Sequence, residues 1–169
     1  AEARAAIAAE LRDPAVAVRG VTVRQPWASH IAYSGKDREN RPRRTSHRGL
    51  VLAHAAAGRV DVDAMDQAPP ELPHLDARGV VLAVARLVGL HHDADCGGRC
   101  SGWAHRGCWH WELTDTHALA TPVKARGELY LWEPDAGLRA RVAAELEPVA
   151  AEQRPAPPLL GTFVQLPLC

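Results

Sequence analysis

This chain of 169 residues has few lysines, no long apolar run and no surplus of charge of either sign. No stretch approaches the roughly twenty apolar residues that a helix needs to span a bilayer, so we expect no membrane partner. Lys plus Arg and Asp plus Glu both total 20, which makes the formal net charge zero. Proteins that coat duplex nucleic acid without sequence preference are usually strongly basic, so this composition disfavours that class. Any binding of nucleic acid must depend on a local concentration of positive charge.

Cysteine is also scarce, with four residues in the whole chain. The first twelve residues are alanine-rich and charged, without the apolar core of a secretory leader, and they predict a helix. We therefore expect a cytoplasmic protein with reduced thiols, not a disulfide framework. The length and the hydrophobic fraction of 47% are typical of one globular domain with a core of its own.

Positive charge is concentrated in residues 36–48, which hold six Lys or Arg side chains and two carboxylates. Pro26 and Gly35 bracket a short predicted helix over 25–34, so this segment starts where that helix ends. A positive field at a helix end favours an anionic partner, and nucleic-acid phosphate is the first candidate. Lys36 is one of only two lysines, at a position where this Arg-rich composition would ordinarily supply arginine.

Several short motifs of the chain resemble those of the ASCH domain, a branch of the PUA-like superfamily. They are R-Q-P-W at 24–27, G-K-x-x-E-x-R at 35–41, R-G at 48–49, H-A at 54–55 and R-G-x-L-x-L-W at 126–132. The resemblance covers residues 20–134. It implies an α+β fold, a small PUA-like mixed β-barrel with flanking α-helices. It also implies a domain that binds RNA or a modified nucleobase.

The hydrophobic pattern gives the same fold class independently. Short alternating or apolar runs predict strands, and apolar steps of four predict a C-terminal helix. Short strands separated by loops, with helices at the margins, favour a small mixed barrel. We expect a helical extension at 1–19, the barrel at 20–134, and a helix with a Pro-rich tail at 135–169. The expected strands are 21–24, 50–55, 80–90, 108–113 and 121–131, with 162–166 as an edge strand, and the expected helices are 1–12, 25–34, 60–67 and 135–147.

The basic segment predicts a ligand cleft. Arginine can bind phosphate through two parallel hydrogen bonds, and lysine supplies a point charge. Glu39 can orient an arginine, act as a general acid or base, or accept a hydrogen bond from a base amine. The alternative is a solvated network of salt bridges. Trp103 lies in a Gly-rich loop and is expected to be exposed for stacking, whereas Trp27 and Trp111 are expected in the core. The candidate nucleic-acid-binding residues are Arg24, Lys36, Glu39, Arg41, Arg43, His54 and Trp103.

A hydrolase is the alternative function. The resemblance implies two enzymatic branches, one ribonuclease-like and one an amidohydrolase on N4-acetylcytidine that uses a Lys and a Thr three positions later. Lys36 matches the first position, but Glu39 occupies the second, so the hydroxyl nucleophile is missing. A ribonuclease needs acid–base groups and positive charge, which Lys36, Glu39, His54 and His110 could supply. The sequence contains neither a P-loop nor a dinucleotide-binding fingerprint.

Three of the four cysteines lie close together among histidines, in the pattern C-x3-C-x7-C. Thiolates and imidazoles suit tetrahedral Zn²⁺, and a closed site would fasten a Gly-rich loop. The alternative is free thiols. A structural zinc also suggests a third function, a zinc-stabilised protein-interaction domain. The expected ligands are Cys96, Cys100 and Cys108 with one of His91, His92, His105 and His110, of which His110 is the first choice.

Overall fold

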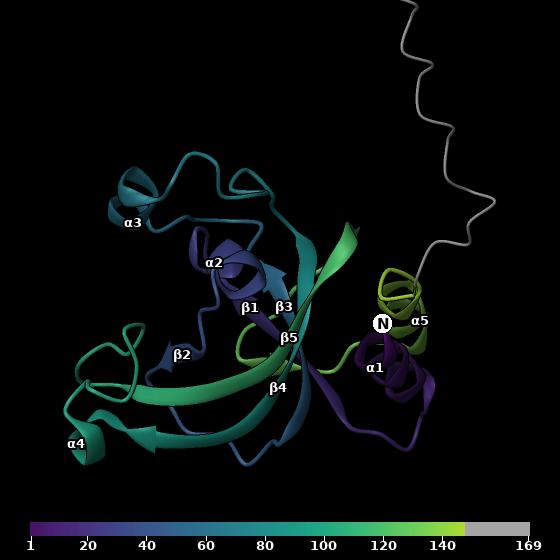
Figure 1. Cartoon of the computed structure of the whole chain (residues 1–169), viewed down its shortest axis with the longest axis horizontal. Helices are drawn as coiled ribbons and strands as arrows, with labels where there is room; N and C mark the ends of the chain where they lie inside the picture. Colours follow the sequence, from purple (N-terminus) through teal and green to yellow (C-terminus); the bar gives the residue numbers. More distant parts are fainter. Residues whose placement is uncertain (148–169) are drawn as a thin grey trace, which may run out of the picture.

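The computed structural model describes residues 1–147 (Figure 1). The predicted tail and edge strand after residue 147, and Cys169, lie outside the described residues. The helices are α1 (Glu2–Arg12), α2 (Trp27–Tyr33), α3 (Val62–Gln67), α4 (Asp93–Cys96) and α5 (Ala136–Ala144). The strands are β1 (Val18–Val23), β2 (Arg38–Arg41), β3 (Gly49–Ala55), β4 (Val80–His92), β5 (Trp109–Lys124) and β6 (Leu131–Trp132).

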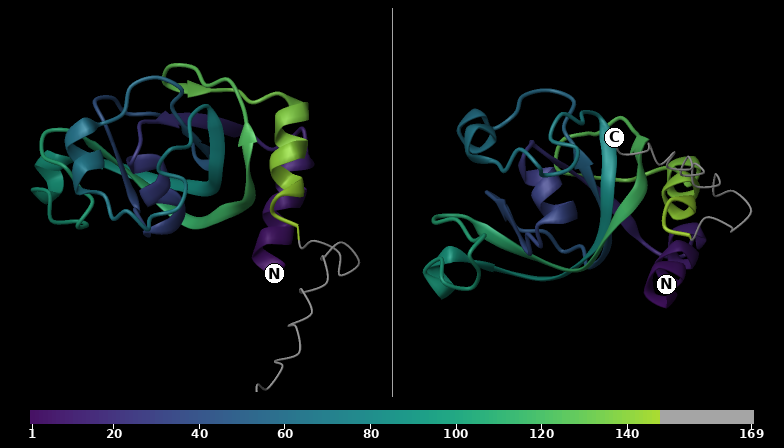
Figure 2. Two further views of the ribbon diagram at one scale, coloured as in Figure 1. Left: turned by 90° about the horizontal axis from the view of Figure 1, so that it is seen from above. Right: turned by 45° about the horizontal axis from the view of Figure 1, so that its top comes forward.

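All six strands form one sheet in the order β2-β5-β4-β3-β1-β6. Only β1 and β3 pair in parallel, and the other neighbours are antiparallel. The long β4–β5 pair is interrupted by three register shifts, and such bulges bend a strand. The sheet therefore curls into a half-barrel (Figures 1 and 2). The predicted α+β class with a barrel-like sheet is confirmed, and the PUA-like assignment stays a prediction.

Both faces of the sheet are covered, because successive side chains of a strand point to opposite faces. In β3, Leu50 and Leu52 pack in the cluster that contains α1 and α5, whereas Val51 and Ala53 pack in the cluster that contains α2. Helix α2 lies inside the curl of the sheet, and α1 and α5 lie together outside it (Figure 1). The loop after α2 therefore emerges at the open side of the half-barrel, where β2 begins.

Most predicted elements are present with shifted bounds. The helix expected over 25–34 begins after Pro26, which is its N-cap residue. The expected strands 108–113 and 121–131 are not separate, because residues Trp109–Lys124 form one continuous strand, β5, which pairs along the whole of β4. Residues 125–130 of the second expected strand lie in no strand, and β6 begins at Leu131. Trp111 is buried as expected, whereas Trp27 is only half-buried. No helix among residues 1–147 is both long enough and apolar enough to cross a bilayer.

Candidate functional site

Three predicted site residues form one hydrogen-bonded cluster beside β2. Glu39 and Arg41 are two apart in this strand, so their side chains lie on the same face. Glu39 Oε1 accepts from Arg41 Nε at 2.9 Å, and Glu39 Oε2 accepts from Lys36 Nζ at 2.9 Å. Lys36 Nζ also donates to the carbonyl of Arg38. A single buried carboxylate thus joins a buried ammonium to a guanidinium that remains partly exposed.

The charges of this cluster keep Glu39 ionised. Burial alone would raise the pKa of the Glu39 carboxyl, but the nearby charges and hydrogen bonds of Lys36 and Arg41 outweigh burial and lower it. The cluster therefore holds two cations and one carboxylate, with a net charge of about +1. Such a site attracts an anion, but less strongly than its two cations would without the carboxylate.

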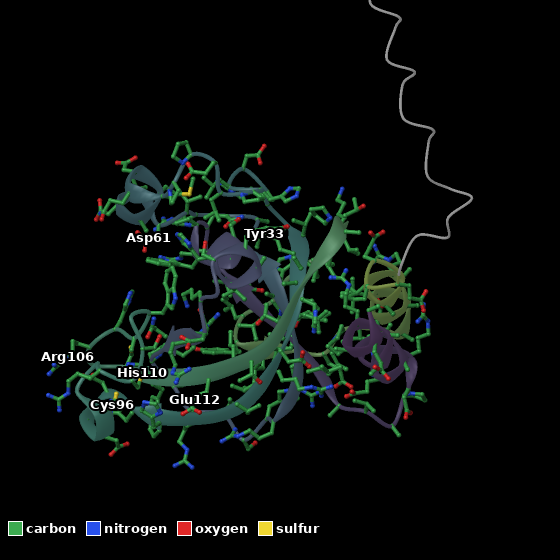
Figure 3. The ribbon with its side chains drawn as sticks, in the orientation of Figure 1. Tyr33, Asp61, Cys96, Arg106, His110 and Glu112 are labelled. Carbon is green, nitrogen blue, oxygen red and sulfur yellow. The ribbon has the colours of Figure 1, made fainter. Side chains whose placement is uncertain are left out.

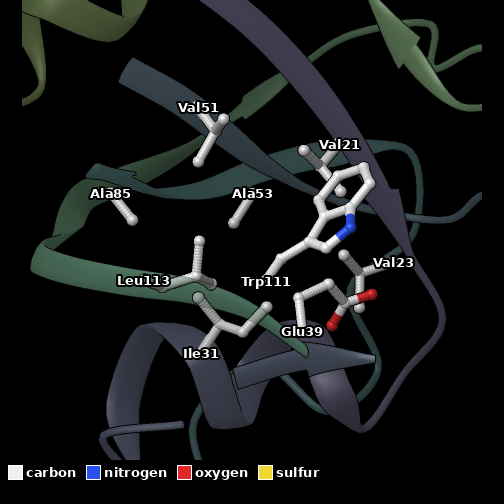
Figure 4. A pocket seen from close by; sticks show the side chains of 9 residues that line it. All are labelled: Val21, Val23, Ile31, Glu39, Val51, Ala53, Ala85, Trp111 and Leu113. Carbon is white, nitrogen blue, oxygen red and sulfur yellow. The ribbon is translucent and has the colours of Figure 1, made fainter. Parts of the chain in front are cut away.

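The same cluster connects two strands that are not neighbours in the sheet. Arg41 Nη2 donates to the carbonyl of Thr22 in β1 at 2.8 Å, although β1 and β2 lie at separate positions in the strand order. Glu39 also borders the small apolar hollow inside the curl of the sheet, together with Val21, Val23 and Trp111 (Figure 4). Its methylene groups therefore face the core, while its carboxylate faces the two cations.

Three adjoining hollows meet at the half-buried ring of Trp27, and we call them together the Trp27 cleft. The smallest has a volume of about 130 Å³ and is lined by Trp27, Lys36, Glu39, Asn40, Asp61 and His105. A second extends past Arg24 and Arg41. A third extends past His30 and Trp103. The cleft therefore has a charged arm and an aromatic arm, and Trp27 borders both.

Hydrogen bonds fix the aromatic walls of the Trp27 cleft. Asp61 Oδ2 accepts from Trp27 Nε1 at 2.9 Å, and Asp61 Oδ1 caps α3 through the amide of Ala64. The rings of Trp27 and His105 lie edge to face with centroids 5.6 Å apart. His30 lies 5.7 Å from Trp27 and 5.0 Å from Trp103, measured between ring centroids. The result is a row of four aromatic rings along one arm.

Two predicted site residues lie outside the Trp27 cleft. Arg43 is exposed, and its guanidinium lies 4.9 Å from the ring centroid of Tyr130. His54 is only 1% exposed and lies between β1 and the segment before β6. Its Nε2 lies 2.9 Å from the carbonyl of Ala125, and its Nδ1 lies 3.3 Å from Thr22 Oγ1. His54 therefore has a structural place in the interior, because β3 directs its side chain away from the cleft.

Four residues of the Trp27 cleft were missed in the sequence. His30 and Asp61 lie within segments predicted to be helices, and His105 is predicted only as a candidate metal ligand. Asn40 holds the loop that carries the other aromatic residues: its Nδ2 donates to the carbonyl of Trp103, and its Oδ1 accepts from the amide of His105, both at 2.9 Å. None of the four is a defining residue of a motif, since Asn40 occupies a variable position of G-K-x-x-E-x-R, so only the tertiary structure identifies them.

A second cluster of functional side chains lies at the far end of the β4–β5 pair. Ligand atoms of His91, Cys96, Cys100 and His110 all lie within 4.8 Å of one another, which is compact enough to hold a metal ion. Cys96 and His110 are labelled there in Figure 3. His110 Nδ1 lies 3.4 Å from each of the two sulfur atoms and from His91 Nε2.

The cluster differs from the expected ligand set in one residue: His91 belongs to it, and Cys108 does not. His91 lies directly opposite His110 in the β4–β5 register, so the pairing of the strands brings the two rings together. Cys108 lies in the turn before β5, and its Sγ is 3.3 Å from the carbonyl of His105. The expected histidine His110 is present and fully buried.

The groups around this cluster fit metal binding. Histidine ligands usually donate their second ring nitrogen to a carboxylate or a carbonyl. His91 Nδ1 lies 2.8 Å from Glu112 Oε1, and His110 Nε2 lies 2.6 Å from the carbonyl of His105. Burial alone would raise the pKa of the Cys96 thiol, but hydrogen bonds from the Gly98 amide, His91 and Cys100 lower it to about 6. Burial and the neighbouring Cys96 raise the pKa of the Cys100 thiol, so Cys96 is the more acidic of the two thiols and the first to reach the thiolate form that binds metal.

Comparison with known proteins adds no family to these observations. No protein-family model matches the chain. A search of the curated proteins also finds no match. The ASCH resemblance therefore depends on the short motifs alone, and the observations that bear on function come from the Trp27 cleft and from the cluster of His91, Cys96, Cys100 and His110.

Proposed function

We propose that the Trp27 cleft binds single-stranded RNA and takes one base between its aromatic and charged arms. The observation that carries this proposal is that Trp27 borders both arms, the one with Arg24 and Arg41 and the one with Trp103. Proteins that read single strands stack bases on aromatic rings and contact the backbone through positive charge. The two arms supply these two kinds of contact on either side of one ring.

The polar groups of the cleft have distinct tasks in this proposal. Arg24 is exposed and Arg41 is partly exposed, so both can reach a phosphate. Glu39 is ionised, and each carboxylate oxygen has more than one lone pair, so it can also accept from an exocyclic base amine. Lys36 is buried and serves chiefly to hold Glu39 in place.

Binding fits the geometry better than acid–base catalysis does. A general base works best when its pKa lies near the working pH, and the neighbours of Glu39 lower its pKa instead. Both of its oxygens already accept charged hydrogen bonds. No contact among residues 1–147 favours the hydrolase alternative over binding.

The test measures binding of short, labelled single-stranded RNA by fluorescence anisotropy at several salt concentrations, with gel analysis for cleavage products. Arg24→Ala should weaken binding and reduce the slope of log K against log salt by about one, because one phosphate contact is lost. Trp103→Ala should weaken binding about tenfold or more through lost stacking, with little change in that slope. Arg12→Ala is the matched control, because Arg12 lies on α1, outside the curl of the sheet.

Four outcomes would overturn the proposal. Wild-type protein that binds no RNA excludes it, and tighter binding of the same sequence as DNA would reassign the ligand. Equal affinity of all three variants would locate binding elsewhere on the molecule. RNA cleavage that disappears in Lys36→Ala would make the protein an enzyme.

We also infer that the cluster of His91, Cys96, Cys100 and His110 binds Zn²⁺, and that this zinc has a structural role. Two thiolates and two imidazoles form a closed tetrahedral donor set, which is typical of structural zinc. Elemental analysis of purified protein should find about one zinc per chain. Cys100→Ser should lose it, and Cys108→Ser should keep it. Such a zinc is also compatible with a protein-interaction domain. In that case the protein would bind no RNA, and substitution of Lys36 would not change its affinity for the protein partner.

A further inference from the structure

We propose that a metal ion bound by the His91, Cys96, Cys100 and His110 cluster holds Trp103 and His105 in the Trp27 cleft, so that RNA affinity depends on the metal. The dependence of RNA affinity on the metal rests on the proposed function, whereas the positioning of the two rings by the metal does not. The two sites share one stretch of chain, and this connection is the basis of the inference.

The first observation is the position of the ligands along the chain. The segment that carries Trp103 and His105 begins directly after one ligand, Cys100, and ends at another, His110. Residues 97–108 contain neither helix nor strand. A metal that binds both ends converts this segment into a short closed loop with fewer accessible conformations.

The second observation is a direct contact between the two sites. The ring of His110 faces the cluster through Nδ1, and its Nε2 lies 2.6 Å from the carbonyl of His105. The ring of His105 in turn contacts the face or edge of Trp27. A metal bound at Nδ1 fixes the orientation of the imidazole, and it leaves the proton on Nε2 for donation to His105.

The third observation is that the remaining attachments of the loop are few. Asn40 bonds the backbone of both Trp103 and His105, and Ser101 Oγ lies 2.5 Å from Asp37 Oδ1. These anchors all lie on the side of the loop near β2. The side near β4 is attached through the cluster and through Asp93, whose carboxylate bonds Arg106 and the amide of Gly107 and whose amide donates to the carbonyl of Cys108. Without the metal, only contacts such as the 3.4 Å approaches of His110 Nδ1 to the two sulfur atoms would join these side chains.

The experiment compares zinc-loaded wild-type protein, the same protein after removal of zinc with a chelator, and the chelated protein after zinc is restored. Trp103 emission is obtained as the difference between the wild type and Trp103→Phe, and affinity is measured with a short single-stranded RNA. We expect removal of zinc to shift Trp103 emission to the red and to weaken RNA binding about tenfold, with far-UV circular dichroism nearly unchanged. Restored zinc should reverse both effects.

Matched variants repeat the test without a chelator. Cys100→Ser should reproduce the zinc-free protein, whereas Cys108→Ser changes a cysteine of the same loop outside the cluster and should behave as the wild type. If zinc-loaded protein binds no RNA but Trp103 still responds to zinc, the proposed function fails and the positioning role stands. If zinc is lost and neither Trp103 emission nor affinity changes, the inference is overturned. Unfolding of the whole chain on zinc removal would also overturn it, because the effect would not be confined to the loop.

Discussion

At the scale of single residues, Glu39 connects the fold to the candidate site. Its carboxylate bonds Lys36 and Arg41, and Arg41 continues to the carbonyl of Thr22 across the open side of the half-barrel. A buried ion pair adds little net stability compared with apolar packing, but removal of one partner leaves an uncompensated charge in the interior. The segment 36–41 therefore closes the open side of the sheet, and the proposed binding surface is part of this closure.

Glu39→Gln should destabilise the protein by about 3–5 kcal/mol, because it leaves Lys36 buried without its counter-charge. The free energy of unfolding is measured by urea denaturation at neutral pH. The control is Glu147→Gln, which breaks the exposed pair with Arg12 and should cost at most about 1 kcal/mol. Equal effects of the two substitutions would contradict the role given to Glu39.

His54 should make the protein sensitive to acid. Burial lowers the pKa of this imidazole from its ordinary 6.5, and the hydrogen bond to Ala125 offsets burial only in part. The unfolded chain therefore binds this proton more readily than the folded chain does. The stability due to neutral His54 is complete above pH 6.5 and declines as the pH falls through 6.5 towards the lowered value.

The measurement compares His54→Gln with the wild type. Glutamine can still donate to the carbonyl of Ala125, but it does not titrate. Urea midpoints of both proteins are recorded on either side of pH 6.5. The wild type should lose more stability than the variant as the solution is acidified, and parallel pH profiles would contradict this role of His54.

At the scale of elements, the register of the strands decides which side chains meet. The β4–β5 register sets His91 opposite His110, although nineteen positions separate them in the sequence. The pairing of β1 with β6 sets Gly20 opposite Trp132. A Cβ at position 20 would overlap the indole ring of Trp132, so this strand glycine marks a close approach of a side chain to the backbone.

Gly20→Ala should therefore destabilise the protein by about 1–3 kcal/mol, because the added methyl group displaces the Trp132 ring. Thermal unfolding monitored by tryptophan fluorescence measures the effect. Gly58→Ala is the control: an added Cβ there meets no atom within 4 Å, and we expect no comparable loss. A neutral Gly20→Ala would mean that the β1–β6 edge rearranges freely.

At the scale of the whole molecule, α1 and α5 belong to the same core as the sheet. Leu11 is fully buried in the cluster that also contains Leu50, Leu52 and Leu138. The helical extension predicted from the sequence is therefore packed on the barrel-like sheet. We expect the described part of the chain to unfold as one cooperative unit, since one apolar cluster joins the terminal helices to the strands.

Leu11→Ala should cost about 2–5 kcal/mol and shift one common transition, because it opens a cavity between α1 and the sheet. Within each protein, circular dichroism and tryptophan fluorescence should give the same urea midpoint, and the midpoint of the variant should be lower than that of the wild type. Leu129→Ala is the control, because Leu129 is 84% exposed and its truncation should have little effect. Two separate transitions in the Leu11 variant would show that α1 melts independently.

Local patterns were sufficient to predict several parts of this molecule. The apolar run before His91 predicted a buried strand, the steps of four from Leu138 predicted α5, and the charge after Gly35 drew attention to Lys36, Glu39 and Arg41. These features depend on neighbours within a few positions, which is the range over which helix and strand periodicities operate. The sequence also indicated a candidate metal site in the segment rich in cysteine and histidine, because thiolates and imidazoles are typical zinc ligands.

Only the tertiary structure decided which of these residues meet. Strand register brought His91 to His110 and left Cys108 aside, directed His54 into the interior, and placed Asp61 and His105 against Trp27. Register and loop placement follow from packing of the whole core. A shift of one strand by one residue would point each of its side chains to the opposite face of the sheet. The sequence by itself therefore determined the fold class and the chemical groups available, whereas long-range packing determined the composition of both sites.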